Sequence, residues 1–221
     1  MGASALGGRV TDRLRGAIGV FGGTFDPIHV AHLAVAEAAR DTYGLRRVLF
    51  VPAAEPPHKP GRGITAVEHR LAMVEAAIAG NAGFKISRIE IDRPGPSYTV
   101  DTLVALRETD PGGHLALILS AESFAELPTW HRAEGILELA DLIVAPREGY
   151  RTVDTETVGR EVSLGDTRVV HLDGPRIRLS ASEIRERAAA GRSIRYLVPD
   201  AVAAYISDHD LYQHRRRTDR S

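Results

Sequence analysis

Cysteine is absent from this chain of 221 residues. Disulfide bonds, thiolate metal ligands and a cysteine nucleophile are therefore excluded, and the absence is typical of a reducing compartment. The chain also lacks an apolar run near the roughly 20 residues of a membrane-spanning helix. Residues 1–16 lack the unbroken apolar stretch of a secretory signal. Together these absences predict a cytoplasmic protein without a membrane segment.

The chain also lacks an excess of either charge. Its 28 Lys and Arg residues balance 29 Asp and Glu residues, for a net charge of −1. This balance gives no electrostatic reason to expect binding to nucleic acid or to a membrane surface. The basic run Arg215–Arg217 is a candidate for nucleic-acid contact, but it is short and unaccompanied, so we interpret it as a solvated tail.

The composition that remains is that of an ordinary globular protein. Hydrophobic residues make up 43% of the chain, which supports a sizeable core. The length fits one large α/β domain, with or without a small appendage. We expect a flexible leader over residues 1–16, a single domain over residues 17–212 and a flexible basic tail over residues 213–221. The sequence is compatible with a homo-oligomer.

Short apolar runs alternate with helical patterns along the chain, which is typical of βαβ units. We expect strands at residues 17–21, 47–51, 84–91, 115–119, 142–145 and 169–172. We expect helices at residues 28–43, from 65 onward, and at 99–108, 129–139, 180–190 and 199–208. Thr65 with Glu68, and Ser180 with Glu183, have the spacing of capping boxes. The alternation predicts an α/β fold with a mostly parallel sheet.

Residues with useful chemistry follow the expected strands. They lie at residues 22–32, 52–59 and 120–130, and at Arg147. In open α/β sheets, ligands bind beyond the carboxyl ends of the strands, where the strand order reverses. We therefore expect these segments to meet at one end of the sheet.

The segment after the first strand is the most informative one. Gly22 and Gly23 let the backbone approach a ligand closely. His29 and His32 share one face at the start of a helix, whose free N–H groups attract anions. Phosphate binding is one interpretation. Two others stay open from the residues alone: structural histidines, or a metal site completed by Asp26. The segment is neither a P-loop nor a dinucleotide fingerprint.

The run Gly-Gly-Thr-Phe-Asp-Pro-Ile-His-Val-Ala-His resembles the signature of the HxGH nucleotidyltransferase superfamily, and within it of the bacterial nicotinate-nucleotide adenylyltransferases. The resemblance extends from Gly19 to Tyr205. Further motifs in the family order are Pro56–Lys59, Ser97–Thr102, Trp130, Arg147–Gly149 and Ser180–Arg185. Ala31 departs from the glycine of the signature, and Ser120-Ala121-Glu122 departs from the family's Gly-Ala-Asp.

The resemblance implies a Rossmann-like, doubly wound fold with a small helical C-terminal part. It implies that the 5′-phosphate of nicotinate mononucleotide attacks the α-phosphorus of ATP, which gives deamido-NAD and pyrophosphate. Because that phosphate is already anionic, catalysis would rest on positioning and charge stabilisation. Mg²⁺ would be bound through ATP, without a dedicated cage of protein carboxylates.

The resemblance also implies a role for each matching residue. The catalytic residues would be His29, His32 and Arg185. ATP would be bound by Gly22, Gly23, Thr24, Phe25, Ser182 and Glu122. The mononucleotide would be bound by His58, Lys59, Tyr98, Thr99, Trp130 and Arg147. The backbone N–H groups of Tyr98 and Thr99 would take the nicotinate carboxylate, and Trp130 would stack on the pyridine ring.

Other interpretations of these residues remain open. The hydroxyls of Ser97 and Thr99 could only cap a helix, Trp130 could belong to the core, and Arg185 could be a surface residue. Three other functions are also open. The acceptor could be nicotinamide mononucleotide, the chain could be a catalytically weakened nucleotide-binding module, or His29, His32 and Asp26 could serve a metal-dependent hydrolase.

Overall fold

The computed structural model describes residues 12–56, 63–146 and 155–213. Its strands are β1 (Ile18–Gly23), β2 (Arg47–Pro52), β3 (Phe84–Ile86), β4 (Leu115–Ser120), β5 (Asp141–Ala145) and β6 (Val169–His171). Its helices are α2 (Val30–Tyr43), α3 (Val67–Ile78), α4 (Thr99–Thr109), α5 (Ala121–Glu126), η1 (Leu127–Thr129), α6 (Ala133–Leu139), α7 (Thr155–Gly159), α8 (Ala181–Ala189) and α9 (Asp200–Asp208). Within these ranges no helix is both long and apolar enough to cross a membrane.

The strands form one sheet in the order β3-β2-β1-β4-β5-β6, and every pair is parallel. The chain runs outward from β1 to β3 and then returns to place β4 on the other side of β1. The strand order therefore reverses between β1 and β4, where ligands bind in doubly wound sheets. The predicted Rossmann-like α/β fold is confirmed.

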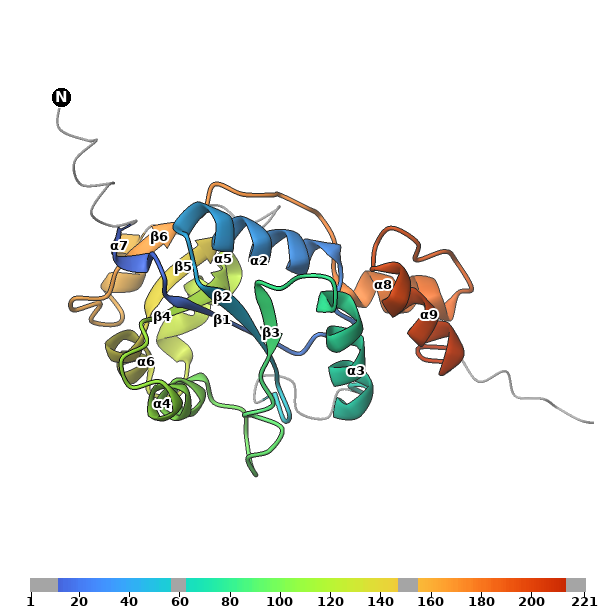
Figure 1. The fold of residues 1–221 in the computed structure, drawn as a ribbon, viewed down its shortest axis with the longest axis horizontal. Helices are drawn as coiled ribbons and strands as arrows, with labels where there is room; N and C mark the ends of the chain where they lie inside the picture. Colours follow the sequence, from blue (N-terminus) through green and yellow to red (C-terminus); the bar gives the residue numbers. More distant parts are fainter. Residues whose placement is uncertain (1–11, 57–62, 147–154, 214–221) are drawn as a thin grey trace, which may run out of the picture.

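Alternating side chains of the strands build one core on each face of the sheet. In β4, Ala116 and Ile118 join one buried cluster, whereas Leu115, Leu117 and Leu119 join the other. The first cluster contains buried residues of α2, α3, α8 and α9, and the second contains those of α4, α5, α6 and α7. Figure 1 shows α2 along one face of the sheet and α4 with α6 along the other. The sheet is thus covered on both faces, as a parallel sheet requires.

The C-terminal helices α8 and α9 lie together beside α3, at one end of the molecule (Figure 1). Ile184 of α8 and Val202 of α9 are buried in the same cluster as Met73 of α3. The small helical C-terminal part thus packs onto the first half of the domain.

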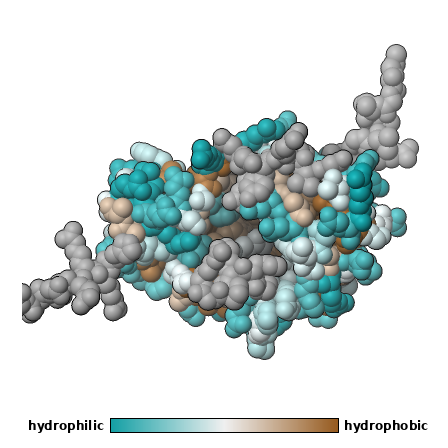
Figure 2. Space-filling model, turned by 180° about the vertical axis from the view of Figure 1, so that it is seen from behind, coloured by the Kyte–Doolittle hydropathy of each residue, from teal (hydrophilic) through white to brown (hydrophobic). Residues whose placement is uncertain are grey.

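Most of the described surface seen from behind is hydrophilic, and hydrophobic residues show mainly around a hollow near the middle of that face (Figure 2). Three large hydrophobic side chains among the described residues are exposed: Val104, Ile177 and Tyr196.

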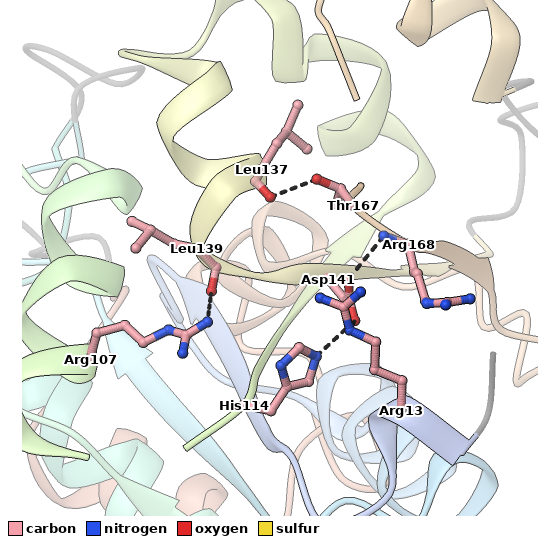
Figure 3. A network of polar contacts seen from close by, with 8 residues as sticks. All are labelled: Arg13, Arg107, His114, Leu137, Leu139, Asp141, Thr167 and Arg168. Atoms are coloured by element: carbon pink, nitrogen blue, oxygen red, sulfur yellow. Dashed lines mark hydrogen bonds and ion pairs between the residues drawn. The ribbon is translucent and has the colours of Figure 1, made fainter. Parts of the chain in front are cut away.

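The amino end of the sheet is closed by a polar network centred on Asp141 (Figure 3). The Asp141 side chain is 2% exposed, and its Oδ2 lies 2.7 Å from His114 Nε2 and 3.3 Å from Arg13 Nε. Its Oδ1 accepts a hydrogen bond from the backbone N–H of Arg168 at 2.9 Å. The same network includes hydrogen bonds to the carbonyl groups of Leu137 and Leu139, donated by Thr167 and Arg107.

Several sequence predictions of local structure are wrong. The strand predicted at 84–91 ends at Ile86, because residues 87–92 turn back through the bonds Ile91 N–H to Arg88 O and Asp92 N–H to Arg88 O. Thr65 does not cap a helix, since α3 starts after Ala66. The helix predicted at 129–139 is η1 followed by α6, and α5 and α7 were not predicted.

Candidate active site

Two adjoining pockets open at the carboxyl ends of β1 and β4. The first pocket has a volume of about 400 Å³ and lies between the N-termini of α2 and α8. The second has a volume of about 650 Å³ and extends toward the N-terminus of α4. Both are lined by Gly22, Thr24, Ser123 and Trp130. The shared residues mark where a group bound in one pocket would meet a group bound in the other.

The two glycines at the end of β1 are required for different reasons. A Cβ on Gly22 would meet nothing within 4 Å, so the open side of this residue faces the pockets. A Cβ on Gly23 would lie 2.9 Å from Phe25 Cζ. Phe25 has a φ of 49°, and its ring is buried beneath the loop at 3% exposure. Gly23 therefore makes room for a protein ring, and Gly22 leaves room for a ligand.

The two histidines lie together at the start of α2. His29 is the N-cap residue, and its ring stacks on that of His32 with 3.7 Å between centroids. The His29 backbone N–H donates to His32 Nδ1 at 3.2 Å. Phe25 contacts the His32 ring edge-on, with the centroids 5.2 Å apart. Both histidines line the first pocket. Two positive charges on rings this close would repel each other.

Asp26 is held by protein groups on both carboxylate oxygens. The Thr65 N–H donates to Oδ2 at 3.2 Å, and the Tyr212 hydroxyl donates to Oδ1 at 2.8 Å. No group of three His, Cys, Asp or Glu side chains suited to a metal ion occurs in the described ranges. The engagement of Asp26 argues against a metal site made with His29 and His32.

Arg70 of α3 ties together three segments around the pockets. Its side chain is 1% exposed, and it donates to the carbonyls of Thr65, Thr24 and Ala54 at 2.9, 2.8 and 3.3 Å. Burial lowers the pKa of Arg70, and the negative charge of Asp26 opposes that effect. Sequence reasoning missed this residue. The available signal was an arginine in the apolar stripe of a helix, beside Leu71 and Val74.

The start of α8 faces the first pocket. Ser180 caps the helix by accepting a hydrogen bond from the Glu183 N–H at 3.1 Å. Arg185 donates to the Asp26 carbonyl at 2.6 Å and to Ser182 Oγ at 3.2 Å. Ser182 and Arg185 both line this pocket. The structure thus brings Arg185 to the loop that carries His29, across 159 residues of sequence.

The departure at Ser120 has a local explanation. Ser120 caps α5: its Oγ accepts from the Ser123 N–H at 3.1 Å, which glycine could not do. Glu122 lines the second pocket rather than the first. The predicted contact of Glu122 with ATP stays a prediction. Ala31, the other departure, lines the first pocket.

The second pocket holds the aromatic and hydroxyl groups expected around a mononucleotide. Tyr98, Thr99 and Trp130 all line it. Tyr98 stacks on His131 with 4.2 Å between centroids, and His131 was not among the predicted residues. The Tyr98 N–H donates to the Pro96 carbonyl at 2.9 Å. That group is therefore already used, which corrects the expectation that it takes a substrate carboxylate.

The Ser97 hydroxyl does not cap α4. It accepts hydrogen bonds from the backbone N–H groups of Ala54 and Glu55 at 3.0 and 3.2 Å, so it joins the end of β2 to the start of α4. Glu90, which sequence reasoning missed, lines the same pocket at 6% exposure and accepts from Thr102 Oγ1 at 2.6 Å. Burial raises the pKa of the Glu90 carboxyl, against the hydrogen bonds from Thr102 and Ser97.

Three predicted substrate residues lie outside the described residues: His58, Lys59 and Arg147. Their predicted roles stay predictions.

A model of the family described as cytidylyltransferase-like matches residues 20–187. A protein of Thermomicrobium roseum named "Probable nicotinate-nucleotide adenylyltransferase" is 48% identical over 196 residues, which are 89% of this chain and 91% of that protein. A protein of the same name from Salinibacter ruber is 46% identical, over 89% of this chain and 97% of its own length. The chain belongs to the nicotinate-nucleotide adenylyltransferase family.

Solved structures agree with this membership at the level of the fold. Two structures of Plasmodium falciparum nicotinic acid mononucleotide adenylyltransferase each match with a TM-score of 0.71, at 18% and 20% identity. They cover 90% and 89% of this chain, and the matches span 98% and 97% of those chains. One is complexed with APC, an ATP analogue, and the other with NaAD. The family uses ATP and generally a divalent metal.

Proposed function

We propose that this chain transfers the adenylyl group of ATP to nicotinate mononucleotide, which yields deamido-NAD and pyrophosphate. The observation that carries the proposal is the pair of pockets that meet at Gly22, Thr24, Ser123 and Trp130. A two-substrate transfer needs two sites that share one reacting position. We also propose that the reaction takes place in the cytoplasm, which the absence of cysteine supports.

The first pocket suits ATP. Pro175, Ile177 and Leu179 give it an apolar wall for a purine base. The pocket also lies at the N-termini of α2 and α8, where backbone N–H groups and the helix dipole favour phosphate. Arg185 adds a positive charge beside them. Its bond to the Asp26 carbonyl fixes its direction, so little side-chain entropy is lost when a phosphate binds.

His32 has the geometry of a neutral hydrogen-bond donor. Because the His29 N–H donates to His32 Nδ1, that nitrogen is the acceptor and the ring carries its proton on Nε2. In the proposed complex with ATP, the Nε2–H group donates to a phosphate oxygen. In the proposed reaction this donor stabilises the charge that develops as the bond to pyrophosphate breaks.

The second pocket suits the mononucleotide. The Trp130 ring can stack on a pyridine ring. Thr99 is the first residue of α4, so its backbone N–H has no partner within the helix and can meet the nicotinate carboxylate together with its own hydroxyl. Tyr98, fixed by its stack on His131, completes the wall, and Glu122 belongs to this side of the site.

The reaction itself requires no protein base. An oxygen of the mononucleotide 5′-phosphate forms a bond to the α-phosphorus of ATP, and the bond from that phosphorus to the β-phosphate oxygen breaks. The leaving pyrophosphate takes the electron pair. Mg²⁺ carried by the ATP phosphates supplies further charge neutralisation. We do not assign Asp26 as a ligand of this Mg²⁺, because both Asp26 carboxylate oxygens accept hydrogen bonds from the protein.

The test compares kcat/KM for nicotinate and nicotinamide mononucleotide with ATP and Mg²⁺, by chromatography of the dinucleotide product. We expect the acid to be preferred by at least about tenfold, because its carboxylate accepts hydrogen bonds that an amide nitrogen cannot accept. A preference for the amide would overturn the acceptor assignment. ATP binding without release of pyrophosphate in the presence of either acceptor would identify a nucleotide-binding module.

A further inference from the structure

Asp26 links the loop after β1 to three distant segments. Its side chain is 5% exposed, and its two carboxylate oxygens accept from the Thr65 N–H and the Tyr212 hydroxyl. Its carbonyl accepts from Arg185. The loop is thereby tied to the start of α3, to α8 and to the segment that follows α9. The tie to Tyr212 spans 186 residues.

Tyr212 reaches Asp26 through an unusual backbone path. After α9, Asp210 has a φ of 51° and Tyr212 a φ of 65°. Left-handed conformations are costly for residues other than glycine and persist where the surroundings fix them. The Leu211 N–H donates to the Ile206 carbonyl at 3.0 Å, which turns the chain back on itself. The Tyr212 hydroxyl also lies 4.0 Å from Met73 Sδ.

The Tyr212 hydroxyl remains a donor at neutral pH. Burial chiefly, and then the neighbouring Asp26 carboxylate, raise the pKa of the phenol above its ordinary value. The Asp26 carboxylate also interacts favourably with the buried guanidinium of Arg70. The pair is therefore a directed hydrogen bond from a protonated phenol to an ionised carboxylate, of the stronger, charge-assisted class.

We infer that Tyr212 is a positioning residue of the active site, which fixes Asp26 and so sets where His29 and Arg185 lie around the first pocket. Asp26 precedes the N-cap His29 by three residues, and its carbonyl directs Arg185. Charge-stabilising donors must be held within about 0.5 Å of their working positions. Without the hydroxyl, a buried carboxylate oxygen loses its partner and the loop shifts to find another. This inference rests on the proposed adenylyl transfer.

Tyr212→Phe in the full chain removes the hydroxyl and keeps the ring. The chain offers a matched control in Tyr205→Phe. The Tyr205 hydroxyl also joins the C-terminal part to α3, through His69 Nδ1 at 3.0 Å, but does not touch the loop. Both variants are measured for kcat, for KM of each substrate and for Tm.

We expect Tyr212→Phe to lower kcat about tenfold, with the KM for nicotinate mononucleotide changed less than twofold. Tyr205→Phe should keep kcat within twofold, at a Tm within about 2 °C of that of Tyr212→Phe. Equal kcat values in the two variants would reduce Tyr212 to a structural anchor and overturn the inference.

A binding measurement separates this inference from the proposed function. Trp130 is the single tryptophan of the sequence and lines both pockets, so its fluorescence can report ATP binding without turnover. If the wild-type chain makes no dinucleotide, the proposed function fails. Tyr212→Phe should still weaken ATP binding about fivefold relative to Tyr205→Phe, and unchanged binding would overturn the positioning role.

Asp26→Asn provides a second route to the same interaction. It weakens the acceptor and places an amide where Thr65 donates. We expect Asp26→Asn to lower kcat at least as much as Tyr212→Phe, and the double variant to lose no more than twofold beyond Asp26→Asn alone. Additive losses would contradict a shared action of the two residues.

Discussion

Two buried aspartates, one at each end of the sheet, differ in what their partners hold. Asp141 at the amino end pairs with His114 and Arg13 and accepts a hydrogen bond from the Arg168 N–H (Figure 3). All three partners lie at the amino ends of the strands. Asp26 at the carboxyl end receives Thr65 and Tyr212, and its partners surround a loop beside an open pocket.

The same chemistry therefore serves two purposes. At the amino end, pairing satisfies polar groups that burial would otherwise penalise, so its loss is a loss of stability. At the carboxyl end, we propose that pairing holds a loop whose position matters to bound phosphates, so its loss should be a loss of rate. Changes at the two ends should separate stability from activity.

The largest expected effect is on stability, at the amino end. Asp141→Ala leaves His114, Arg13 and the Arg168 N–H without their acceptor, and we expect the free energy of unfolding to fall by about 2–3 kcal/mol. This loss of unfolding free energy is smaller than for a fully buried ion pair, because His114 and Arg13 are partly exposed. Urea denaturation measures the loss, and kcat/KM should stay within twofold.

The control is Asp110→Ala at the same end of the sheet. Asp110 pairs with Arg46 at 2.6 Å, but both side chains are well exposed. Its removal should cost about 0.5 kcal/mol or less. A similar loss of unfolding free energy in both variants would show that Asp141 contributes no more than an exposed ion pair. A large loss of kcat in Asp141→Ala would contradict the assignment of stability to the amino end and activity to the carboxyl end.

At the carboxyl end, His32→Ala should lower kcat about 100-fold, as for loss of one charge-stabilising donor. The variant also loses the acceptor for the His29 N–H, which costs about 1 kcal/mol of stability as for a helix cap. Steady-state kinetics and denaturation measure the two effects. His69→Ala, which changes a histidine of α3 outside both pockets, should leave kcat within twofold. A near-normal kcat in His32→Ala would remove it from the mechanism.

The smallest expected effect is a dependence of stability on pH at Glu90. Burial raises the pKa of Glu90 in the folded chain above the ordinary value of 4.5, so the folded state holds the proton more tightly. The stability that Glu90 contributes to the folded state is fully present below pH 4.5 and is lost as the pH rises through the folded-state pKa. Glu90→Gln does not titrate. The free energy of unfolding of the wild type, relative to Glu90→Gln, should therefore fall between pH 4 and 8. A constant difference would show that Glu90 ionises normally.

Much of the fold followed from the sequence because its local signals agree. The apolar run Leu115–Leu119 became the central strand β4, and Gly44 ends α2 with a φ of 62° as expected for a glycine C-cap. Ser180 caps α8 through the Glu183 N–H. The segments after β1 and β4 meet because the carboxyl ends of parallel strands share one edge.

The failures have tertiary causes. Thr65 has the spacing of a helix cap, yet its N–H goes to Asp26 and its carbonyl to Arg70, so the helix begins later. The strand predicted through Ile91 stops at Ile86, and Glu90 then turns inward to meet Thr102. In each case a contact with a residue elsewhere in the chain outweighs a local preference.

The sequence by itself determined the parallel α/β architecture and the family, and it predicted the residues proposed to carry the chemistry, because apolar periodicity and motif spacing act over short stretches. Only the tertiary structure decided how that chemistry is held. It placed Glu122 in the second pocket, used the Tyr98 N–H within the chain, and brought Arg70, Arg185 and Tyr212 around the loop that precedes His29. Those bonds join residues up to 186 positions apart, and no local pattern encodes which distant donors a buried carboxylate will meet.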